Sequence, residues 1–435
     1  MRSAGKIPIH DLARPVLPLP IRGLNLAGRP LASRLLSLDP DQLLEAARQR
    51  TRLEDFGDAS FRMPLQALLR ALDGEAELSP VGRFLVRELV VGLLVSRLRL
   101  EELLRRHPEI AEEPIHAPVF IVGLPRTGTT HLHNLLSCDP SFRSLPYWES
   151  LEPIPPSLDR QPRDRPDPRV VRCARALKLV LWMMPLFPAL HAMAPDAAHE
   201  EIQLLAMDFR SMLFEVSYRV PSYAAWFMSH DQTAGYAYLR RVLQALQWLR
   251  GPRRWLLKSP AHIEQLGPLL SVFPDARIVQ THRDPVHVVA SLCTLVTYGR
   301  RMSSLRVDPV AEGHAWSCRL EGMLRASVRD QELVPLRQLV NLRFDELVTD
   351  EPACLERVYQ LIGRPLDERA RQRLSVFGES HRRGARGRID YRLEPFELDA
   401  AELRQRLRFY QERFGVPDEG AEERSRAPVA MTKTA

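Results

Sequence analysis

The sequence predicts an α/β protein with a mostly parallel sheet flanked by helices, a helical region before it and a helical insertion within it. Short apolar segments, each followed by a helical pattern, recur after Ala117, which is typical of a parallel sheet. A long stretch rich in aromatic residues and proline separates the first two strand candidates. We therefore expect a helical region at residues 1–115, an α/β domain at 116–416 that contains an insertion at 149–250, and a disordered polar tail at 417–435.

The N-terminal region contains two clear helix starts. Asp39 precedes Pro40 and Ser79 precedes Pro80, and in each pair an N-cap residue is followed by a proline suited to the first helical turn. The second helix is expected to run from Pro80 to about Arg106. It is long and amphipathic, so we expect it to pack on the α/β domain or on a second subunit, and a homodimer is one of the expected assemblies.

Four short apolar runs are the strand candidates of the α/β domain. They are Val119–Val122, Trp255–Lys258, Arg277–His282 and Leu339–Phe344. Ligands of open parallel sheets bind at the carboxyl ends of the strands, so polar residues that follow these runs are expected to converge on one crevice. The residues in question are Arg126, Ser259, Arg283 and Asp345.

The loop after the first strand candidate has the composition of an anion-binding turn. Gly123 and Gly128 have the spacing of a Walker A motif, but Thr129 stands where that motif has its lysine, and a cation comes earlier, as Arg126. The backbone N–H groups of Thr127 to Thr130 are expected to lie at a helix N-terminus, which suits a phosphate or a sulfate. The loop therefore predicts an anion site that differs from that of the usual P-loop kinases.

A second cationic element follows the third strand candidate. Arg283 ends the strand, and Ser291 comes about two turns into the next helix, so both side chains can face one anion. Lys258 ends the neighbouring strand.

Together, the Pro-Arg-Thr-Gly-Thr-Thr loop and the Arg283-to-Ser291 element resemble the sulfotransferases that use 3′-phosphoadenosine 5′-phosphosulfate (PAPS). The resemblance extends from about Asp39 to Phe414 and is greatest to the bacterial branch related to tyrosylprotein sulfotransferases. It implies a P-loop-NTPase-like fold and transfer of a sulfuryl group to a hydroxyl or an amine. The residues that it assigns to the donor are Arg126, Thr127, Gly128, Thr129 and Thr130 for the 5′-phosphosulfate, and Arg283, Ser291, Arg386 and Gly387 for the 3′-phosphate. For Arg386 and Gly387, which lie in the basic segment His381 to Arg392, a solvated loop is an equal alternative.

The same resemblance implies the catalytic roles. Arg126 would stabilise the charge on the leaving phosphate and Lys258 would support the sulfuryl oxygens, so no metal is expected. The general base is expected to be Glu149, with His262 and the cluster His199-Glu200-Glu201 as alternatives. Two other functions stay open: a P-loop nucleotide-dependent kinase and a non-catalytic nucleotide-binding protein.

The composition limits the location and the partners. The chain of 435 residues has a net charge of +7, which favours anionic ligands but is too small to predict nucleic-acid binding. Five scattered cysteines indicate neither a disulfide framework nor a zinc site, and they favour the cytoplasm. We expect no transmembrane segment, because the apolar stretch Ala176–Ala194 is interrupted by charge and proline. This stretch is either buried core or a wall of the acceptor site, and the acceptor is expected to be a small molecule, a lipid or a glycan.

Overall fold

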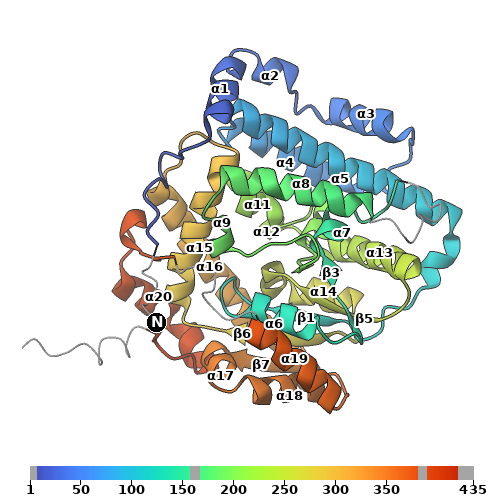
Figure 1. Ribbon diagram of the computed structural model, residues 1–435, viewed down its shortest axis with the longest axis vertical. Coiled ribbons are helices and arrows are strands. Elements are labelled where there is room, and N and C mark those ends of the chain that lie inside the picture. Colours follow the sequence, from blue (N-terminus) through green and yellow to red (C-terminus); the bar gives the residue numbers. More distant parts are fainter. Residues whose placement is uncertain (1–6, 157–166, 381–388, 420–435) are drawn as a thin grey trace, which may run out of the picture.

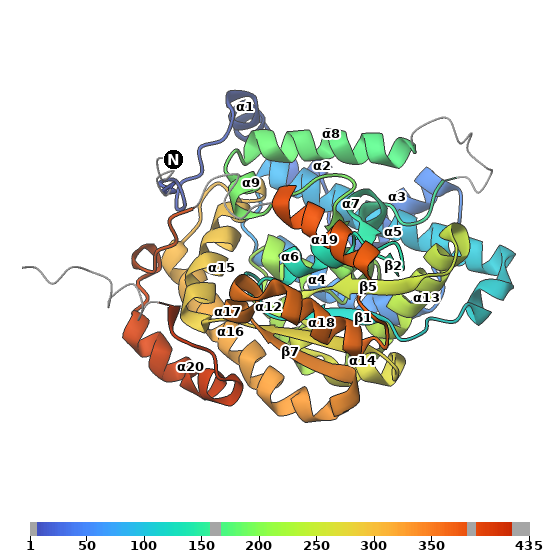
Figure 2. The ribbon, with the colours of Figure 1, turned by 60° about the horizontal axis from the view of Figure 1, so that its bottom comes forward.

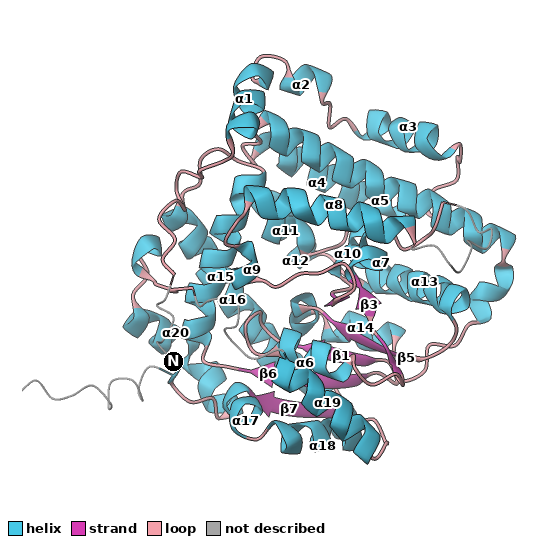
Figure 3. Ribbon diagram, viewed as in Figure 1, coloured by secondary structure: helices cyan, strands magenta, loops and turns pink. Residues whose placement is uncertain are grey.

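The computed structural model describes residues 7–156, 167–380 and 389–419. Its central element is a five-stranded parallel sheet with the strand order β2-β5-β1-β6-β7. Figure 3 shows these strands enclosed by helices. The strands are β1 (Val119–Val122), β2 (Phe142–Arg143), β5 (Arg254–Lys258), β6 (Arg277–His282) and β7 (Leu339–Arg343). The predicted α/β class and its mostly parallel sheet are confirmed.

The strand predictions agree with the structure to within one residue. β1 and β6 have the predicted bounds, β5 begins one residue earlier and β7 ends one residue earlier. The sequence did not predict β2, because a strand of two residues is too short to show an alternating or apolar pattern. It pairs with the start of β5 at the edge of the sheet.

Both faces of the sheet are covered, and alternate residues of each strand divide between two apolar cores. Val119 and Ile121 pack on one face with residues of the helices that follow β1 and β7. Phe120 and Val122 belong to the larger core on the opposite face. Around the first face lie α6 (Thr129–Leu136), α17 (Phe344–Thr349), α18 (Glu351–Leu361) and α19 (Glu368–Ser380). Against the other lie α14 (Leu266–Val272), α15 (Pro285–Gly299), α16 (Pro309–Asp330) and α20 (Ala400–Phe414).

The N-terminal region is helical, as predicted. Asp39 Oδ1 accepts a hydrogen bond of 3.0 Å from the Gln42 N–H, and Ser79 Oγ accepts one of 3.0 Å from the Gly82 N–H, so both predicted caps are confirmed. The helices are α1 (Leu19–Gly28), α2 (Ala32–Leu35), α3 (Pro40–Thr51), α4 (Arg62–Gly74) and α5 (Pro80–Arg106). The larger core is continuous from α3, α4 and α5 to the sheet.

The chain between β2 and β5 forms a layer of helices on the side of α5 (Figures 1 and 2). A small antiparallel pair, β3 (Leu145–Pro146) with β4 (Ala198–His199), ties the two ends of its first part together. The helices are α7 (Tyr147–Leu151), α8 (Pro168–Met183), α9 (Phe187–Leu190), α10 (Ile202–Leu205), α11 (Leu213–Ser217), α12 (Pro221–Ser229) and α13 (Thr233–Arg250). None of the helices in the described ranges combines the length and the apolar character needed to cross a membrane.

The start of α5 touches the turn after α15 at the level of the backbone. The Ser79 N–H donates a hydrogen bond of 2.8 Å to the Ser303 carbonyl. A Cβ atom on Gly82 would lie 2.1 Å from the same carbonyl oxygen, whereas a Cβ on Gly92 of the same helix would meet nothing within 4 Å. Only glycine therefore allows α5 to approach this turn so closely.

We expect Gly82→Ala to lower the free energy of unfolding by about 2 kcal/mol or more, because the methyl group would force the helix away from the backbone of Ser303. Gly92→Ala is the matched control and should raise it by about 0.5–1 kcal/mol, since alanine is the better helix former at an open position. Urea unfolding followed by circular dichroism measures both values. Equal stability of the two variants would contradict the proposed contact.

Candidate active site

A cavity of about 930 Å³ lies at the carboxyl ends of the strands. Its lining includes residues that follow four strands: Arg126 after β1, Pro260 after β5, Arg283 after β6 and Phe344 after β7. Residues of α8 to α11 and of α15 complete the wall. The crevice expected from the sheet topology is therefore present, and it is large enough for a nucleotide-sized ligand together with part of a second one.

The loop between β1 and α6 has the backbone shape of an anion site. Gly128 has a φ of 94°, which the glycine tolerates, and α6 begins at the next residue. Gly128, Thr129 and Thr130 line the cavity. Thr127 lies beneath the loop instead, where its hydroxyl donates to the Leu124 carbonyl at 2.7 Å and lies 2.6 Å from Thr281 Oγ1. The Thr127 side chain therefore stabilises the loop, and its backbone N–H also donates to the Leu124 carbonyl at 3.4 Å, which leaves the N–H groups of Gly128, Thr129 and Thr130 nearest the cavity.

Two guanidinium groups lie beside this loop. Arg126 adopts a left-handed backbone with a φ of 72°, and its side chain donates hydrogen bonds to the Leu190 carbonyl at 2.9 Å and to the Tyr391 hydroxyl at 3.1 Å. Arg283 donates to the Arg126 carbonyl at 2.7 Å. It also holds both carboxylate oxygens of Glu419, at 2.5 and 2.7 Å, and lies over the ring of Phe344. Arg283 thus already binds an anionic group through the fork of its guanidinium.

Lys258 extends from the end of β5 toward the same loop. Its ammonium forms an ion pair with Glu200, and Nζ lies 3.4 Å from the Thr130 hydroxyl. Lys258 is 3% exposed, whereas Glu200 lines the cavity. Burial by itself would raise the pKa of Glu200, but the Lys258 ammonium and its hydrogen bond outweigh burial, so the pKa lies below its usual value. Glu200 is therefore a carboxylate at neutral pH.

Two histidines in the wall of the cavity are neutral. The pKa of His199 is lowered to about 3 and that of His191 to about 4, mainly by burial and in part by the nearby Lys258 ammonium. His199 packs against the Tyr147 ring at 4.5 Å between centroids. The sequence analysis grouped His199, Glu200 and Glu201 as one cluster, but only the first two line the cavity.

Glu201 and His262 form a buried layer behind the cavity. Glu201 Oε2 accepts a hydrogen bond of 2.9 Å from the Lys258 backbone N–H, and Oε1 is bonded to His262 Nε2. His262 Nδ1 lies 2.6 Å from the Tyr236 hydroxyl. His262 is fully buried and does not line the cavity. A ligand in the cavity therefore meets Glu200 rather than His262, and Lys258 lies behind Glu200 and Thr130.

Glu149, which we expected to be the base, lies outside the cavity wall. Its oxygens accept hydrogen bonds of 3.1 Å from Arg143 Nη2 and from Arg250 Nε, and the residue is 3% exposed. Its neighbour Tyr147 does line the cavity. The two arginines hold the Glu149 carboxylate on the side of α7 away from the ligand space.

The other expected site residues differ in position. Ser291 lies on α15, on the helix face that includes the cavity-lining His287 and Leu295, and its buried hydroxyl has no hydrogen-bond partner in the described residues. Ser259 Oγ caps the turn that follows β5, and Asp345 pairs with Arg343 at 3.3 Å, so neither contributes to the cavity wall. Arg386 and Gly387 lie outside the described residues.

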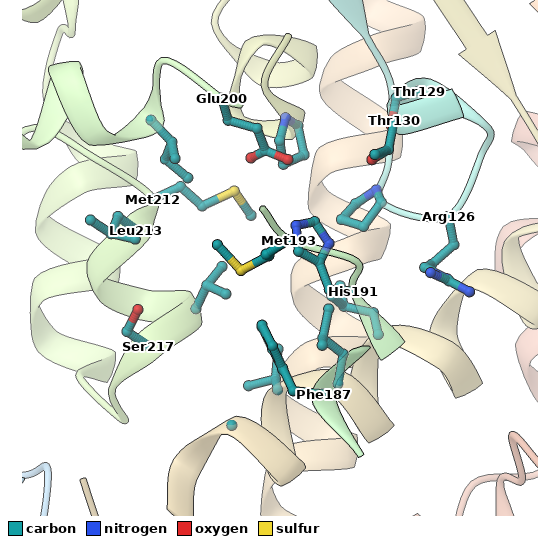
Figure 4. A pocket seen from close by; sticks show the side chains of 18 of the residues that line it. Arg126, Thr129, Thr130, Phe187, His191, Met193, Glu200, Met212, Leu213 and Ser217 are labelled. Carbon is teal, nitrogen blue, oxygen red and sulfur yellow. The ribbon is translucent and has the colours of Figure 1, made fainter. Parts of the chain in front are cut away.

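The end of the cavity away from the loop is apolar. Figure 4 shows Met193, Met212, Leu213 and Phe187 around this part, with Glu200 between it and Thr130. Val180, Met184, Phe187 and Met193, all from the stretch Ala176–Ala194, belong to the wall. The sequence analysis interpreted this stretch as either buried core or a wall of the acceptor site. These four side chains lie in the cavity wall, whereas Met183 and Leu190 are buried in the core.

Sequence reasoning missed His191, His287 and Tyr391 as cavity residues. Tyr391 falls within the basic segment His381 to Arg392, but nothing in the pattern distinguishes this tyrosine from a solvated one. His191 is brought to the site by the turn after α9, which has no local signal. Within the described ranges, no group of three or more His, Cys, Asp or Glu is arranged to hold a metal ion.

Comparisons with known proteins agree with this geometry. Residues 118–368 match the model of the sulfotransferase family, and this range contains the loop, Lys258, Arg283 and Ser291. The chain is 26% identical over 268 residues to the omega-hydroxy-beta-dihydromenaquinone-9 sulfotransferases of Mycobacterium tuberculosis and Mycobacterium bovis. The match covers 57% of this chain and 62% of those relatives, which is less than two thirds of their length.

Two solved structures share the fold. The sulfotransferase STF1 from Mycobacterium tuberculosis has a TM-score of 0.73 at 29% identity, over 85% of this chain and 98% of that one. The sulfotransferase STF9 from Mycobacterium avium has a TM-score of 0.77 at 27% identity, over 87% of this chain and 97% of that one. The likeness to the tyrosylprotein branch stays a prediction. The family match over more than half of the chain, supported by the shared fold, shows that this chain belongs to the sulfotransferase family.

Proposed function

We propose that this protein is an enzyme that transfers a sulfuryl group from PAPS to a hydroxyl, or an amine, of an apolar acceptor. The observation that carries the proposal is one continuous cavity with two chemically different ends. The anion loop and Arg283 line one end, methionine and aliphatic side chains line the other, and Glu200 lies between them (Figure 4).

A sulfotransferase uses a sulfate donor as its co-substrate, and the residues of the donor end fit PAPS. The N–H groups at the start of α6 suit the 5′-phosphosulfate. Arg283 and Ser291 suit the 3′-phosphate, because Arg283 already holds a bidentate anion and the Ser291 hydroxyl is buried with no partner in the described residues. A bound phosphate would replace the Glu419 carboxylate and give Ser291 an acceptor.

The co-substrate supplies an activated sulfuryl group. Arg126 would stabilise the negative charge that develops on the leaving phosphate, and Lys258 with Thr130 would contact the sulfuryl oxygens. Both cations are held in place before any ligand binds: Arg126 by the Leu190 carbonyl and Tyr391, and Lys258 by Glu200. Such prior positioning limits the rearrangement needed in the transition state.

Glu200 would accept the proton of the acceptor. Among the three base candidates it is the ionised carboxylate in the cavity wall, whereas Glu149 is bound by two arginines elsewhere and His262 is enclosed behind Glu201. As the acceptor oxygen bonds to sulfur, its proton would pass to Glu200 and the bond from sulfur to the phosphate oxygen would break. His262 then has a positioning role, through Glu201 and the Lys258 backbone.

The acceptor is proposed to be a lipid or another largely apolar molecule with a terminal hydroxyl. The apolar end of the cavity supports this, because burying an apolar chain there is favourable by about 25 cal/mol per Å². A relative named for a hydroxylated menaquinone fits the same chemistry. Incubation with ³⁵S-labelled PAPS and a cellular lipid extract, against a water-soluble extract, tests the acceptor class, and label only in the soluble fraction would contradict it.

A nucleotide kinase fits less well. Thr129 occupies the position of the Walker A lysine. The Arg283 and Ser291 pair is assigned to a 3′-phosphate, which PAPS has and ATP lacks. Label transfer from ³²P-ATP with Mg²⁺, without transfer from PAPS, would favour the kinase. Binding of both nucleotides without any transfer would favour a non-catalytic protein.

Arg126→Ala should lower kcat by about 10²–10³-fold with a smaller change in nucleotide affinity, because the removed cation acts on charge that develops during the reaction. Arg126→Lys should be milder. Steady-state kinetics with labelled PAPS measures this, with Arg337→Ala, at an exposed site, as the control. Wild-type turnover in the Arg126→Ala variant would exclude the proposed role.

Arg283→Ala should weaken the binding of adenosine 3′,5′-bisphosphate by roughly 10- to 100-fold and leave adenosine 5′-monophosphate nearly unchanged. Glu419→Gln should act in the opposite direction, tightening the bisphosphate by about three- to tenfold, because the competing carboxylate is removed. Glu412→Gln, an exposed ion-pair residue on α20, is the matched control. Calorimetry gives the affinities, and an equal loss for both nucleotides in Arg283→Ala would refute 3′-phosphate recognition.

Glu200→Gln should reduce turnover by about 10²–10⁴-fold at saturating nucleotide while the affinity for adenosine 3′,5′-bisphosphate is retained, because the amide cannot accept the proton. Glu200→Asp, which keeps a charge opposite Lys258, should retain more activity. Glu149→Gln is the control, since it is buried outside the cavity. If turnover falls in Glu149→Gln and not in Glu200→Gln, Glu149 is the base.

A further inference from the structure

The outer side of the N-terminal region presents apolar side chains to solvent. On α1, Ile21 and Asn25 are buried, while Leu19, Leu24 and Leu26 are 75%, 60% and 70% exposed. Val16 before α1, and Leu31 and Leu35 after it, are also exposed. The face of α1 that turns away from the protein is therefore almost entirely apolar, which is uncommon on a protein surface unless something covers it.

The C-terminal end of α8 continues this surface. Leu17, Ile21 and Met183 form a small core of their own, which joins α1 to α8. Figures 1 and 2 both show α1 beside the end of α8 that leads to α9. Leu179 and Trp182 of α8 are 43% and 48% exposed. We call the exposed residues Val16, Leu19, Leu24, Leu26, Leu179 and Trp182 the α1/α8 surface.

The exposed charges on the segments that form the α1/α8 surface are basic, and the Asp11 carboxylate, which accepts a hydrogen bond of 3.2 Å from the Val16 N–H, is paired with Arg301. No Asp or Glu occurs between Asp11 and Asp39 or within α8, whereas Arg22, Arg29, Arg175 and Lys178 are exposed. None of these four cations forms an ion pair with a residue that the structure describes. The apolar face thus has a basic rim with no acidic partner.

From this combination we propose that the α1/α8 surface binds the surface of a lipid bilayer that contains anionic lipids. An amphipathic helix with leucine and tryptophan on one face and arginine at its edge inserts its apolar side chains among the headgroups. Each basic residue near such a surface adds attraction to the anionic lipids. A second copy of the chain fits less well, since a two-fold contact would bring the arginines of one copy against those of the other without acidic residues between them.

The position of the surface links it to the cavity. Val180 and Met184 line the apolar end of the cavity, and Leu179 and Trp182 lie on other faces of the same stretch of chain. Binding to a bilayer would therefore place the apolar end of the cavity close to a lipid acceptor. This link rests on the proposed function. Binding to a bilayer is measured without donor or acceptor, so its outcome is independent of sulfuryl transfer.

Vesicle sedimentation with the full chain tests the proposal. The protein should sediment with phosphatidylcholine vesicles that contain phosphatidylglycerol and bind roughly tenfold less to pure phosphatidylcholine. The double variants Leu19→Ser with Leu26→Ser and Arg22→Gln with Arg29→Gln should each weaken binding about tenfold or more. Leu336→Ser is the matched control, since Leu336 is 91% exposed and lies near β7.

Four results would overturn the proposal. The first is that the wild type remains in solution when anionic vesicles are sedimented. The second is that both double variants bind as tightly as the wild type. The control loses binding equally, which would show that the α1/α8 surface is not the site. Finally, size-exclusion chromatography shows a wild-type dimer that the leucine variant converts to a monomer, without vesicle binding, which would make a second copy the partner. Circular dichroism of each variant establishes that it is folded.

Discussion

Three cations, Lys258, Arg126 and Arg283, lie at one edge of the sheet, and the segments that fold over this edge supply the oxygen atoms that pair with them. A buried charge is costly unless it is paired or hydrogen-bonded. Lys258 is paired with Glu200 and Arg126 with the Leu190 carbonyl, both from the insertion. Arg283 is paired with Glu419 from the C-terminal segment, which follows α20. The need to stabilise these charges therefore accounts for the arrangement of two segments that are far from the loop in sequence.

Consecutive glutamates fix Lys258 at two points. Glu200 binds its ammonium, and Glu201 accepts from its backbone N–H while being held by His262 and, through it, Tyr236. The Lys258 side chain is thus held at its ammonium and at its backbone, although the two glutamates and β5 are separated in sequence by α10 to α13. On the proposed function, a fully buried histidine that does not line the cavity would act on the site only through the position of Lys258.

The sequence predicted the features that neighbouring residues determine, such as strands, turns and helix caps. It did not predict which way a side chain points where residues distant in the sequence determine that direction. β1, the turn at Gly128 and the cap at Asp39 follow from apolar runs and turn residues within a few positions. Nothing near Glu149 indicates that Arg143 of β2 and Arg250 of α13 turn its carboxylate away from the cavity that Tyr147 lines. Likewise, the pattern His-Glu-Glu does not distinguish Glu200, which faces the cavity, from Glu201, which faces the core.

The contacts of α8 connect the site to the exterior of the molecule. Its inner side carries Val180 to the apolar end of the cavity, its end packs on α1 through Met183, and its outer side presents Leu179 and Trp182. One helix therefore contributes to the cavity wall, to the small core with α1 and to the solvent-exposed outer surface. Near its C-terminal end α8 carries apolar side chains on both sides, Val180 toward the cavity and Leu179 and Trp182 toward solvent, so a molecule with a long hydrocarbon chain would meet similar side chains on either side. On the proposed function, an apolar acceptor would then contact apolar side chains both at the surface and in the cavity, which limits its exposure to water.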